Sequence, residues 1–137
     1  MKRPLLLDTC AALWIVADEI SESASNALTE ARGLGMSTYV SPITAWEVGV
    51  MARKGRFRSS YTPQRWFELL MGLPDFVLAD LSPKVLMESS SLPELRTGDP
   101  ADRIIAATAR EYGFTVMTRD QPLLDYARQG YLSAIEC

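Results

Sequence analysis

Short apolar runs alternate with helical patterns along the chain, and this alternation constrains the fold more than any other feature of the sequence. Strands that are joined by helical crossovers lie parallel, and a parallel sheet needs helices on both faces. We therefore expect an α/β fold, a three-layer α/β/α arrangement around a central, mainly parallel sheet of four to five strands. The sequence has no repeat, low-complexity stretch or linker, so residues 1–137 are expected to form a single domain.

Local signals set the expected bounds of these elements. The strands are short apolar runs, expected at 4–7, 36–40, 76–81, 114–118 and 132–135. The helices follow capping residues and stop at glycines or turns, and they are expected at 10–17, 21–32, 42–54, 63–71, 83–90, 99–112 and 121–128. Ser41-Pro42 illustrates the signal, because serine is a favoured N-cap and proline fits the first helical turn.

Composition excludes several kinds of chemistry. The chain has no histidine, which rules out Ser-His-Asp and Cys-His catalysis and any zinc site with histidine ligands. Cys10 and Cys137 are far apart in the sequence and form no CxxC pattern, so a thiolate zinc site or a disulfide framework is not expected. The formal net charge of −3 gives no global attraction to nucleic acid. Carboxylates are therefore the leading candidates for catalysis, together with a hard divalent cation.

The N-terminal segment superficially resembles a secretion signal, because basic residues precede an apolar stretch. Asp8 interrupts that stretch, which argues against a signal peptide. No apolar run approaches the roughly 20 residues of a membrane helix. We therefore expect a cytoplasmic protein that makes no contact with a membrane.

Two acids stand where expected strands end. Asp8 closes the first strand, and Asp120 lies two residues beyond the strand 114–118. Ligands of open parallel sheets bind beyond the carboxyl ends of the strands. Capping a helix is the ordinary role of an aspartate after a strand, and it remains the alternative for each residue taken alone.

Other acids lie on expected helices. Glu47 interrupts the apolar face of the helix 42–54, and a buried carboxylate needs a metal ion, a hydrogen-bond donor or an arginine partner. Asp99 and Asp102 both stand where a helix begins, a position that the helix dipole makes favourable for acids. Acids from separated segments could converge on Mg²⁺ or Mn²⁺, which prefer oxygen ligands and activate water toward a phosphodiester.

Four segments in order resemble the successive motifs of PIN-domain ribonucleases and, more narrowly, of VapC toxins from type II toxin–antitoxin pairs. They are Leu5-Leu6-Leu7-Asp8-Thr9, Ser41-Pro42-Ile43-Thr44-Ala45-Trp46-Glu47, the segment from Gly98 to Ala109, and Thr118-Arg119-Asp120. The set spans nearly the whole chain. A single motif is weakly specific, whereas the ordered set of four is strong.

The resemblance implies a PIN-like fold and a toxin that acts as an endoribonuclease dependent on Mg²⁺ or Mn²⁺. It assigns the acidic quartet to Asp8, Glu47, Asp102 and Asp120, of which Asp8 and Asp102 are the expected direct metal ligands. It leaves Asp99 to capping. Thr118 matches a hydroxyl that helps to orient the site in relatives, and Thr9 either does the same or caps a helix. Many relatives have histidine where this chain has Cys10, and the change removes a possible substrate contact.

The resemblance also implies partners: an RNA substrate, a cognate VapB-type antitoxin, and assembly as a homodimer and as a toxin–antitoxin hetero-oligomer. The apolar helix 10–17 is a candidate wall for an antitoxin groove. Expected RNA contacts are Arg56, Arg58 and Arg103, with solvation as the alternative for the first two and pairing with Asp99 for the third. Four apolar side chains are expected in the core or between subunits: Leu13, Trp14, Trp46 and Phe67.

Two other functions compete with the nuclease. An aspartyl phosphatase or phosphotransferase with Asp8 as nucleophile would need a second acid two residues on, where this chain has Cys10. A catalytically silent PIN-fold binding module would be signalled by the loss of one acid, and all four positions are filled.

Overall fold

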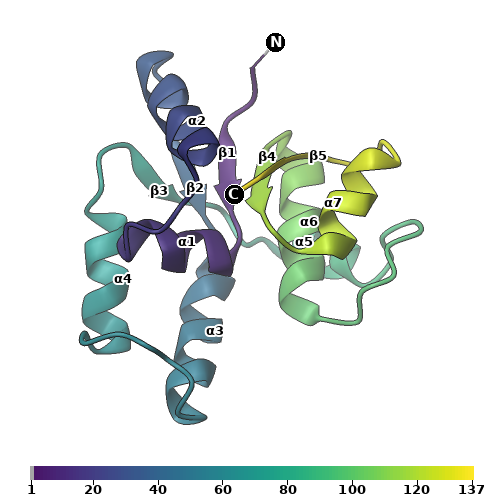
Figure 1. The fold of residues 1–137 in the computed structure, drawn as a ribbon. Coiled ribbons are helices and arrows are strands. Elements are labelled where there is room, and N and C mark those ends of the chain that lie inside the picture. Colours follow the sequence, from purple (N-terminus) through teal and green to yellow (C-terminus); the bar gives the residue numbers. More distant parts are fainter. Residues whose placement is uncertain (1) are drawn as a thin grey trace.

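The central sheet of the computed structural model, which describes residues 2–137, contains five parallel strands in the order β3-β2-β1-β4-β5 (Figure 1). The strands are β1 (Leu5–Leu7), β2 (Thr38–Val40), β3 (Phe76–Leu78), β4 (Thr115–Thr118) and β5 (Ser133–Glu136). In register, Leu7 lies opposite Val40 of β2 and Met117 of β4. The expected parallel sheet is therefore confirmed.

Seven helices lie within residues 2–137. They are α1 (Thr9–Val16), α2 (Glu22–Gly33), α3 (Pro42–Arg53), α4 (Pro63–Met71), α5 (Pro83–Ser89), α6 (Pro100–Tyr112) and α7 (Gln121–Arg128). Each begins after a capping side chain whose oxygen accepts a backbone amide hydrogen, and the caps are Asp8, Ser21, Ser41, Thr62, Ser82, Asp99 and Asp120. Gly113 ends α6 in the left-handed conformation that glycine adopts without strain. Capping thus explains where the helices start.

Four of the five observed strands are shorter than the sequence pattern predicts, and β5 has the predicted length. The expected strand 76–81 ends at Leu78, because only the amide of Ala79 still bonds to Val40 before Ser82 caps α5. The expected strand 36–40 begins only at Thr38, because the amide of Met36 bonds back to the last turn of α2. The expected strands were therefore too long, because apolar residues of the neighbouring turns were counted as part of them.

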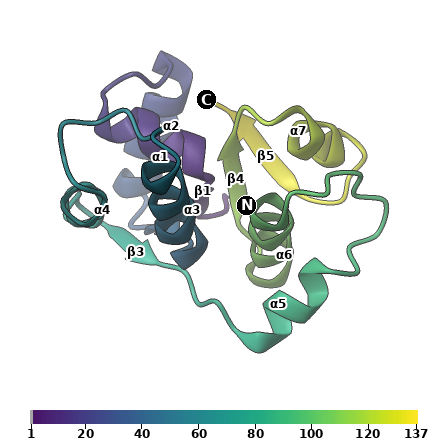
Figure 2. The same cartoon turned by 90° about the horizontal axis from the view of Figure 1, so that it is seen from below.

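Helices cover both faces of the sheet, as Figures 1 and 2 show. Leu5 and Leu7 of β1 pack in one core cluster with residues of α1, α2, α3 and α4. Leu6 points the other way, into a second cluster with residues of α6 and α7, and α5 packs on α6. The alternation of side chains along β1 therefore separates two apolar layers, and the three-layer expectation is confirmed.

The carboxyl ends of the central strands face the side from which Figure 2 is seen. There α1, α3 and the beginning of α6 lie at the edge of the sheet, and α3 contacts both of the others. Among these helices and the rest of residues 2–137, none is long and apolar enough to cross a membrane.

Candidate active site

Asp8 lies directly after β1 and is almost completely buried, with 4% of its surface exposed. Its Oδ1 atom accepts the amide hydrogen of Ala11 at 2.8 Å and so caps α1, while its Oδ2 atom accepts the hydroxyl hydrogen of Thr118. Burial raises the pKa of Asp8, and these two hydrogen bonds counteract that shift. Asp8 is therefore held in one orientation by both neighbouring elements.

Thr118 connects Asp8 to Asp120. The Thr118 oxygen accepts the backbone amide hydrogen of Asp120 at 2.9 Å, and the Thr118 hydroxyl donates to Asp8. Asp120 in turn caps α7 by accepting the amide hydrogen of Leu123 at 3.1 Å. Both aspartates are helix caps, as the simpler alternative predicts, but capping leaves their charges close enough for Asp120 to raise the pKa of Asp8.

Glu47 reaches the same region from the middle of α3. Its Oε1 atom accepts a short hydrogen bond from the hydroxyl of Thr9, which itself lies 3.1 Å from the hydroxyl of Thr44. Burial raises the pKa of Glu47, Thr9 lowers it, and the charges of Asp99 and Asp8 raise it. Within the described chain Glu47 forms no ion pair, so its partner is a threonine and the arginine salt bridge that we considered is not found.

Asp99 and Asp102 have different roles at the start of α6. Asp99 is exposed and caps the helix through the amide of Ala101, at 2.9 Å. Asp102 is half-buried, and no side-chain hydrogen bond to its carboxylate occurs among residues 2–137. Burial raises the pKa of Asp102 to about 7, with further contributions from the charges of four carboxylates, namely Asp120, Asp99, Glu47 and Asp8.

The predicted quartet therefore shares one electrostatic environment, and Asp99 belongs to it as well. No Lys or Arg in the described part of the chain forms an ion pair with any of the five acids. The side chains do not converge on one point as they lie, because no three Asp, Glu or Cys groups among residues 2–137 are arranged to hold a metal ion. The structure thus gathers negative charge without forming a closed coordination shell.

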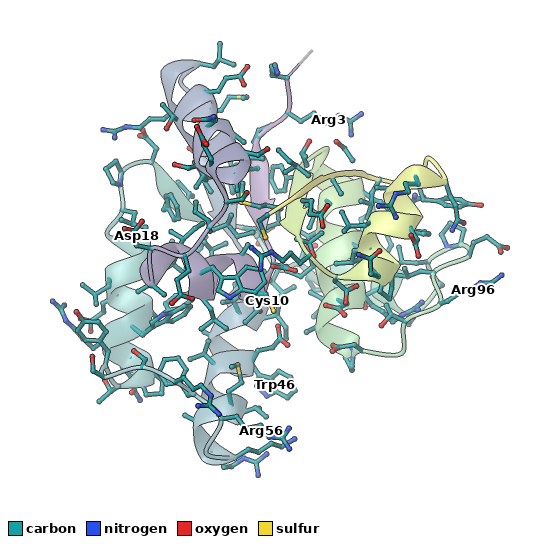
Figure 3. All side chains as sticks on the ribbon, in the orientation of Figure 1. Arg3, Cys10, Asp18, Trp46, Arg56 and Arg96 are labelled. Carbon is teal, nitrogen blue, oxygen red and sulfur yellow. The ribbon has the colours of Figure 1, made fainter. Side chains whose placement is uncertain are left out.

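Cys10 lies beside these acids on the first turn of α1, and its position is labelled in Figure 3. Burial raises the pKa of its thiol to about 11, and Asp8, Glu47 and Asp102 act in the same direction. The thiol is therefore protonated at neutral pH and is a poor nucleophile.

Two of the three expected RNA-binding arginines lie beyond the end of α3. Arg56 and Arg58 are exposed in the segment that follows α3, and Figure 3 shows Arg56 beyond Trp46 toward the far end of that helix. Both line a groove of about 540 Å³ whose other wall includes Leu13 and Trp14 of α1. Neither guanidinium forms an ion pair within the described residues.

Arg103 has a different environment from the one expected. Its Nε atom donates to the carbonyl of Ser89 at 2.7 Å, and its Nη1 atom donates to the carbonyls of Leu95 and Thr97 at 3.2 and 3.0 Å. No ion pair with Asp99 is found in this part of the structure. Contact with RNA stays a prediction for Arg103, while the observed contacts fasten the loop between α5 and α6.

The apolar side chains expected in the core differ in burial. Leu13, Trp14 and Phe67 are partly buried and pack against the first core cluster. Trp46 is 59% exposed beside Glu47, so its assignment to the core is wrong and only the subunit contact remains.

Sequence reasoning missed two sets of contacts. Thr44 is completely buried and touches Thr9, and the only signal for it was its position one helical turn before Glu47. Arg119 lies with its guanidinium carbon 3.9 Å from the ring centroid of Trp14 and donates to the carbonyl of Cys137 at 2.8 Å. Arg119 therefore ties α1 to Cys137, which follows β5 and lies near Asp8, and no local sequence pattern predicted this contact.

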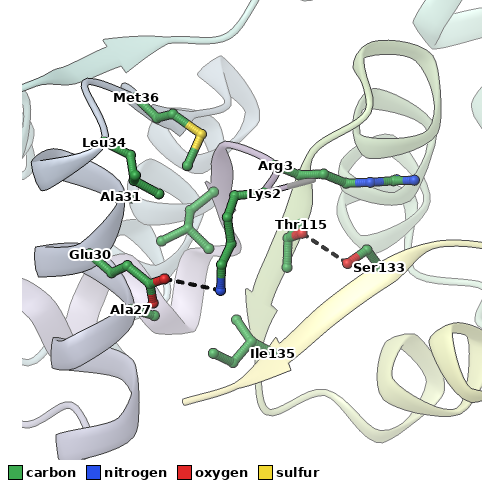
Figure 4. A pocket seen from close by; sticks show the side chains of 11 residues that line it. Lys2, Arg3, Ala27, Glu30, Ala31, Leu34, Met36, Thr115, Ser133 and Ile135 are labelled. Atoms are coloured by element: carbon green, nitrogen blue, oxygen red, sulfur yellow. Dashed lines mark hydrogen bonds and ion pairs between the residues drawn. The ribbon is translucent and has the colours of Figure 1, made fainter.

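A second pocket, of about 310 Å³, lies at the amino end of the sheet between α2 and the strands (Figure 4). Lys2 and Glu30 form an ion pair of 3.0 Å across it, and Thr115 and Ser133 bond to each other at 2.8 Å. None of the predicted site residues lines this pocket. The carboxyl end of the sheet is therefore the candidate active site.

The chain is similar to known proteins in sequence and in fold. The sequence pattern of the PIN domain family matches residues 5–129. Ribonuclease VapC22 from Mycobacterium tuberculosis (strain ATCC 25618 / H37Rv) is 32% identical over 121 residues, which cover 87% of this chain and 88% of that protein.

Solved structures share the fold at lower sequence identity. VapBC2 from Rickettsia felis, bound to a DNA fragment from their promoter, has a TM-score of 0.68 at 18% identity, covering 96% of this chain and 97% of that one. A toxin–antitoxin complex from Klebsiella pneumoniae has a TM-score of 0.59 at 24% identity, covering 96% and 95%. FitAcB from Neisseria gonorrhoeae has a TM-score of 0.56 at 20% identity, covering 96% of both chains.

Proposed function

Since this chain belongs to the PIN domain family, we propose that it is a VapC-type toxin, an endoribonuclease that requires Mg²⁺ or Mn²⁺ and is held in check by a VapB-type antitoxin. The observation that carries the proposal is the group of acids from separate elements at the carboxyl end of the sheet, with no cationic side chain paired to them within residues 2–137. The likeness to a protein named Ribonuclease VapC22 supports RNA as the substrate class.

The donor set fits a hard divalent cation by its chemistry. All the donors are carboxylate oxygens, which Mg²⁺ and Mn²⁺ prefer, and the charges of neighbouring acids help to raise the pKa values of Asp8, Glu47 and Asp102. A bound cation would neutralise this charge and activate water toward a phosphodiester. We assign direct contacts to Asp8 and Asp102, with Glu47 and Asp120 completing the site.

The two proposed direct ligands differ in the hydrogen bonds that hold them. Asp8 is anchored by Ala11 and Thr118, so it provides a carboxylate of fixed orientation. The carboxylate of Asp102 accepts no side-chain hydrogen bond within the described chain, so it is free to turn toward a cation. We propose that rotation of the Asp102 side chain completes the site, since hydrogen bonds already hold the carboxylates of Asp8 and Glu47.

Substrate contacts are proposed for the basic segment after α3. Arg53, Lys54, Arg56 and Arg58 are all exposed, and such a cluster attracts the RNA backbone although the whole chain has a net charge of −3. Lys54 lies seven residues beyond Glu47, which is about 10 Å along a helix. Phosphates on one side of the scissile bond would therefore reach these cations.

The groove between α1 and the segment 56–61 is the proposed antitoxin site. Leu13, Trp14 and Val16 give it an apolar wall, while Arg56 and Arg58 give it positive charge. A segment with apolar and acidic side chains fits such a groove. Assembly as a homodimer, with the exposed Trp46 in a subunit contact, and as a toxin–antitoxin hetero-oligomer belongs to the same proposal.

The decisive experiment is cleavage of a structured RNA pool by the purified chain, free of antitoxin, with Mg²⁺, Mn²⁺ or EDTA. The expected result is cutting that needs the metal and is lost in Asp8→Asn and Asp102→Asn. Asp125→Asn is the matched control, because Asp125 is exposed on α7 and pairs with Arg128. A folded protein that cuts no RNA with either metal and is not toxic to growing cells would favour the silent PIN-fold module instead.

A further inference from the structure

Hydrogen bonds connect two threonine hydroxyls in series to the carboxylate of Glu47. Thr44 is completely buried on α3, one helical turn before Glu47, and Thr9 is buried at the first position of α1. The Oγ1 atoms of the two threonines are 3.1 Å apart, and the Thr9 hydroxyl also contacts Oε1 of Glu47. The three side chains therefore form one continuous set of hydrogen bonds between α1 and α3.

The direction of these bonds follows from counting hydrogens. A hydroxyl has one hydrogen to donate, and an ionised carboxylate only accepts. Thr9 donates its hydrogen to Glu47, so the contact between the threonines requires Thr44 to donate and Thr9 to accept. The hydrogen bonds thus run from Thr44 to Thr9 and from Thr9 to Glu47.

We propose that Thr44 is a positioning residue, which acts through Thr9 to hold Glu47 in the orientation that leaves its second oxygen, Oε2, for the acidic site. The inference rests on the proposed function and deepens it. Hydrogen bonds in series polarise and strengthen one another in a buried setting, and an unpaired buried hydroxyl is costly. Without Thr44, the Thr9 hydroxyl loses its donor and is free to turn away from Glu47.

The site contains a second arrangement of the same kind. Thr118 accepts the amide hydrogen of Asp120 and donates its own hydrogen to Asp8. In both cases a buried threonine accepts one hydrogen bond from a neighbouring residue and donates another to a carboxylate of the site. Such outer contacts typically change metal affinity or activity by about 10-fold to 100-fold when they are removed.

The test compares four variants by their Mn²⁺ dissociation constant, by kcat and KM for RNA cleavage at saturating Mn²⁺, and by thermal unfolding. Thr44→Val and Thr9→Val remove one hydroxyl each, and Thr44→Ser restores the donor. Thr108→Val is the matched control, because Thr108 is a buried helical threonine whose hydroxyl bonds to Ile104 of its own helix. Thr44→Cys, which has a similar volume and a weak donor, replaces Thr44→Val if that variant does not fold.

We expect Thr44→Val to weaken Mn²⁺ binding or to lower kcat by about 10-fold. Thr9→Val should have a larger effect on the same quantity. Thr44→Ser should restore most of what Thr44→Val loses. KM for RNA should stay within about two-fold, because neither threonine lines the groove that contains Arg56 and Arg58. Equal Mn²⁺ affinity and kcat in Thr44→Val and Thr108→Val would overturn the inference alone. A wild-type chain that neither binds Mn²⁺ nor cuts RNA would overturn the proposed function and the inference together.

Discussion

Thr118 donates its hydroxyl hydrogen to Asp8, and this bond joins residues that are 110 positions apart in the sequence. The contact follows from the sheet, since Leu7 of β1 pairs with Met117 of β4 and each site residue is the next one along its chain. The amide of Asp8 also bonds to the carbonyl of Met117, at 3.1 Å. The proposed metal ligand is therefore fixed by the same register that aligns the two strands.

Removing this hydroxyl should affect both stability and activity. We expect Thr118→Val to lower the free energy of unfolding by about 1–3 kcal/mol, because the buried carboxylate of Asp8 and the partly buried amide of Asp120 lose their partner. The measurement is urea unfolding, together with RNA cleavage. Thr115→Val is the control, since Thr115 lies at the other end of β4 and bonds to Ser133. Equal losses in the two variants would contradict a special role for Thr118.

The pH dependence of stability should reveal the acidic cluster when no divalent cation is present. Burial and neighbouring carboxylates raise the pKa of Asp102 from 3.8 to about 7, so the folded chain keeps this proton to a higher pH than the unfolded chain. The stabilisation from the protonated group is then lost as the pH rises toward 7. In EDTA, the thermal midpoint of Asp102→Asn should exceed that of the wild type by a margin that widens from pH 5 to 7 and levels off above pH 8. A difference between the two thermal midpoints that does not change with pH would contradict a raised pKa of Asp102.

The order of strands and helices was readable from the sequence because the signals are local. Aspartates and serines before prolines marked helix starts at Ser41 and Asp99, and the structure places caps at both. The strand order β3-β2-β1-β4-β5 was not predicted, because it depends on which helices pack together across the sheet. The ends of strands were also less certain, as the strand expected to reach residue 81 shows.

The residues of the candidate site likewise fall into two groups, those that the sequence indicated and those that only the structure revealed. Asp8 and Asp120 were predicted because they follow strands, and Glu47 because it interrupts an apolar helix face. The hydroxyl of Thr44 and the carbonyl contacts of Arg103 were not found, because each depends on how side chains point between segments that are distant in sequence. Local pattern thus indicated Asp8, Glu47 and Asp120, the choice of Asp102 over Asp99 rested on the family resemblance, and the residues that orient the acids required the structure.

Mn²⁺ should stabilise the fold if the acids bind it. A ligand present at about 100 times its dissociation constant adds about 2.7 kcal/mol to the free energy of unfolding. We expect a rise in the thermal midpoint of the wild type with MnCl₂, and a smaller rise in Asp102→Asn, which lacks one proposed ligand. Asp125→Asn should respond like the wild type, because its carboxylate pairs with Arg128 on the surface. An equal response in Asp102→Asn would remove that residue from the ligand set.

Arg103 should prove to be a stabilising residue of the loop between α5 and α6. Its guanidinium bonds to three carbonyls, and the single ammonium group of a lysine cannot span them. Arg103→Lys should therefore lower the free energy of unfolding by about 1–3 kcal/mol and speed proteolysis within residues 90–99. Arg96→Lys is the control, because Arg96 projects from the same loop and is exposed (Figure 3). Unchanged stability in Arg103→Lys, combined with weaker RNA binding, would instead support the substrate contact that the sequence predicted.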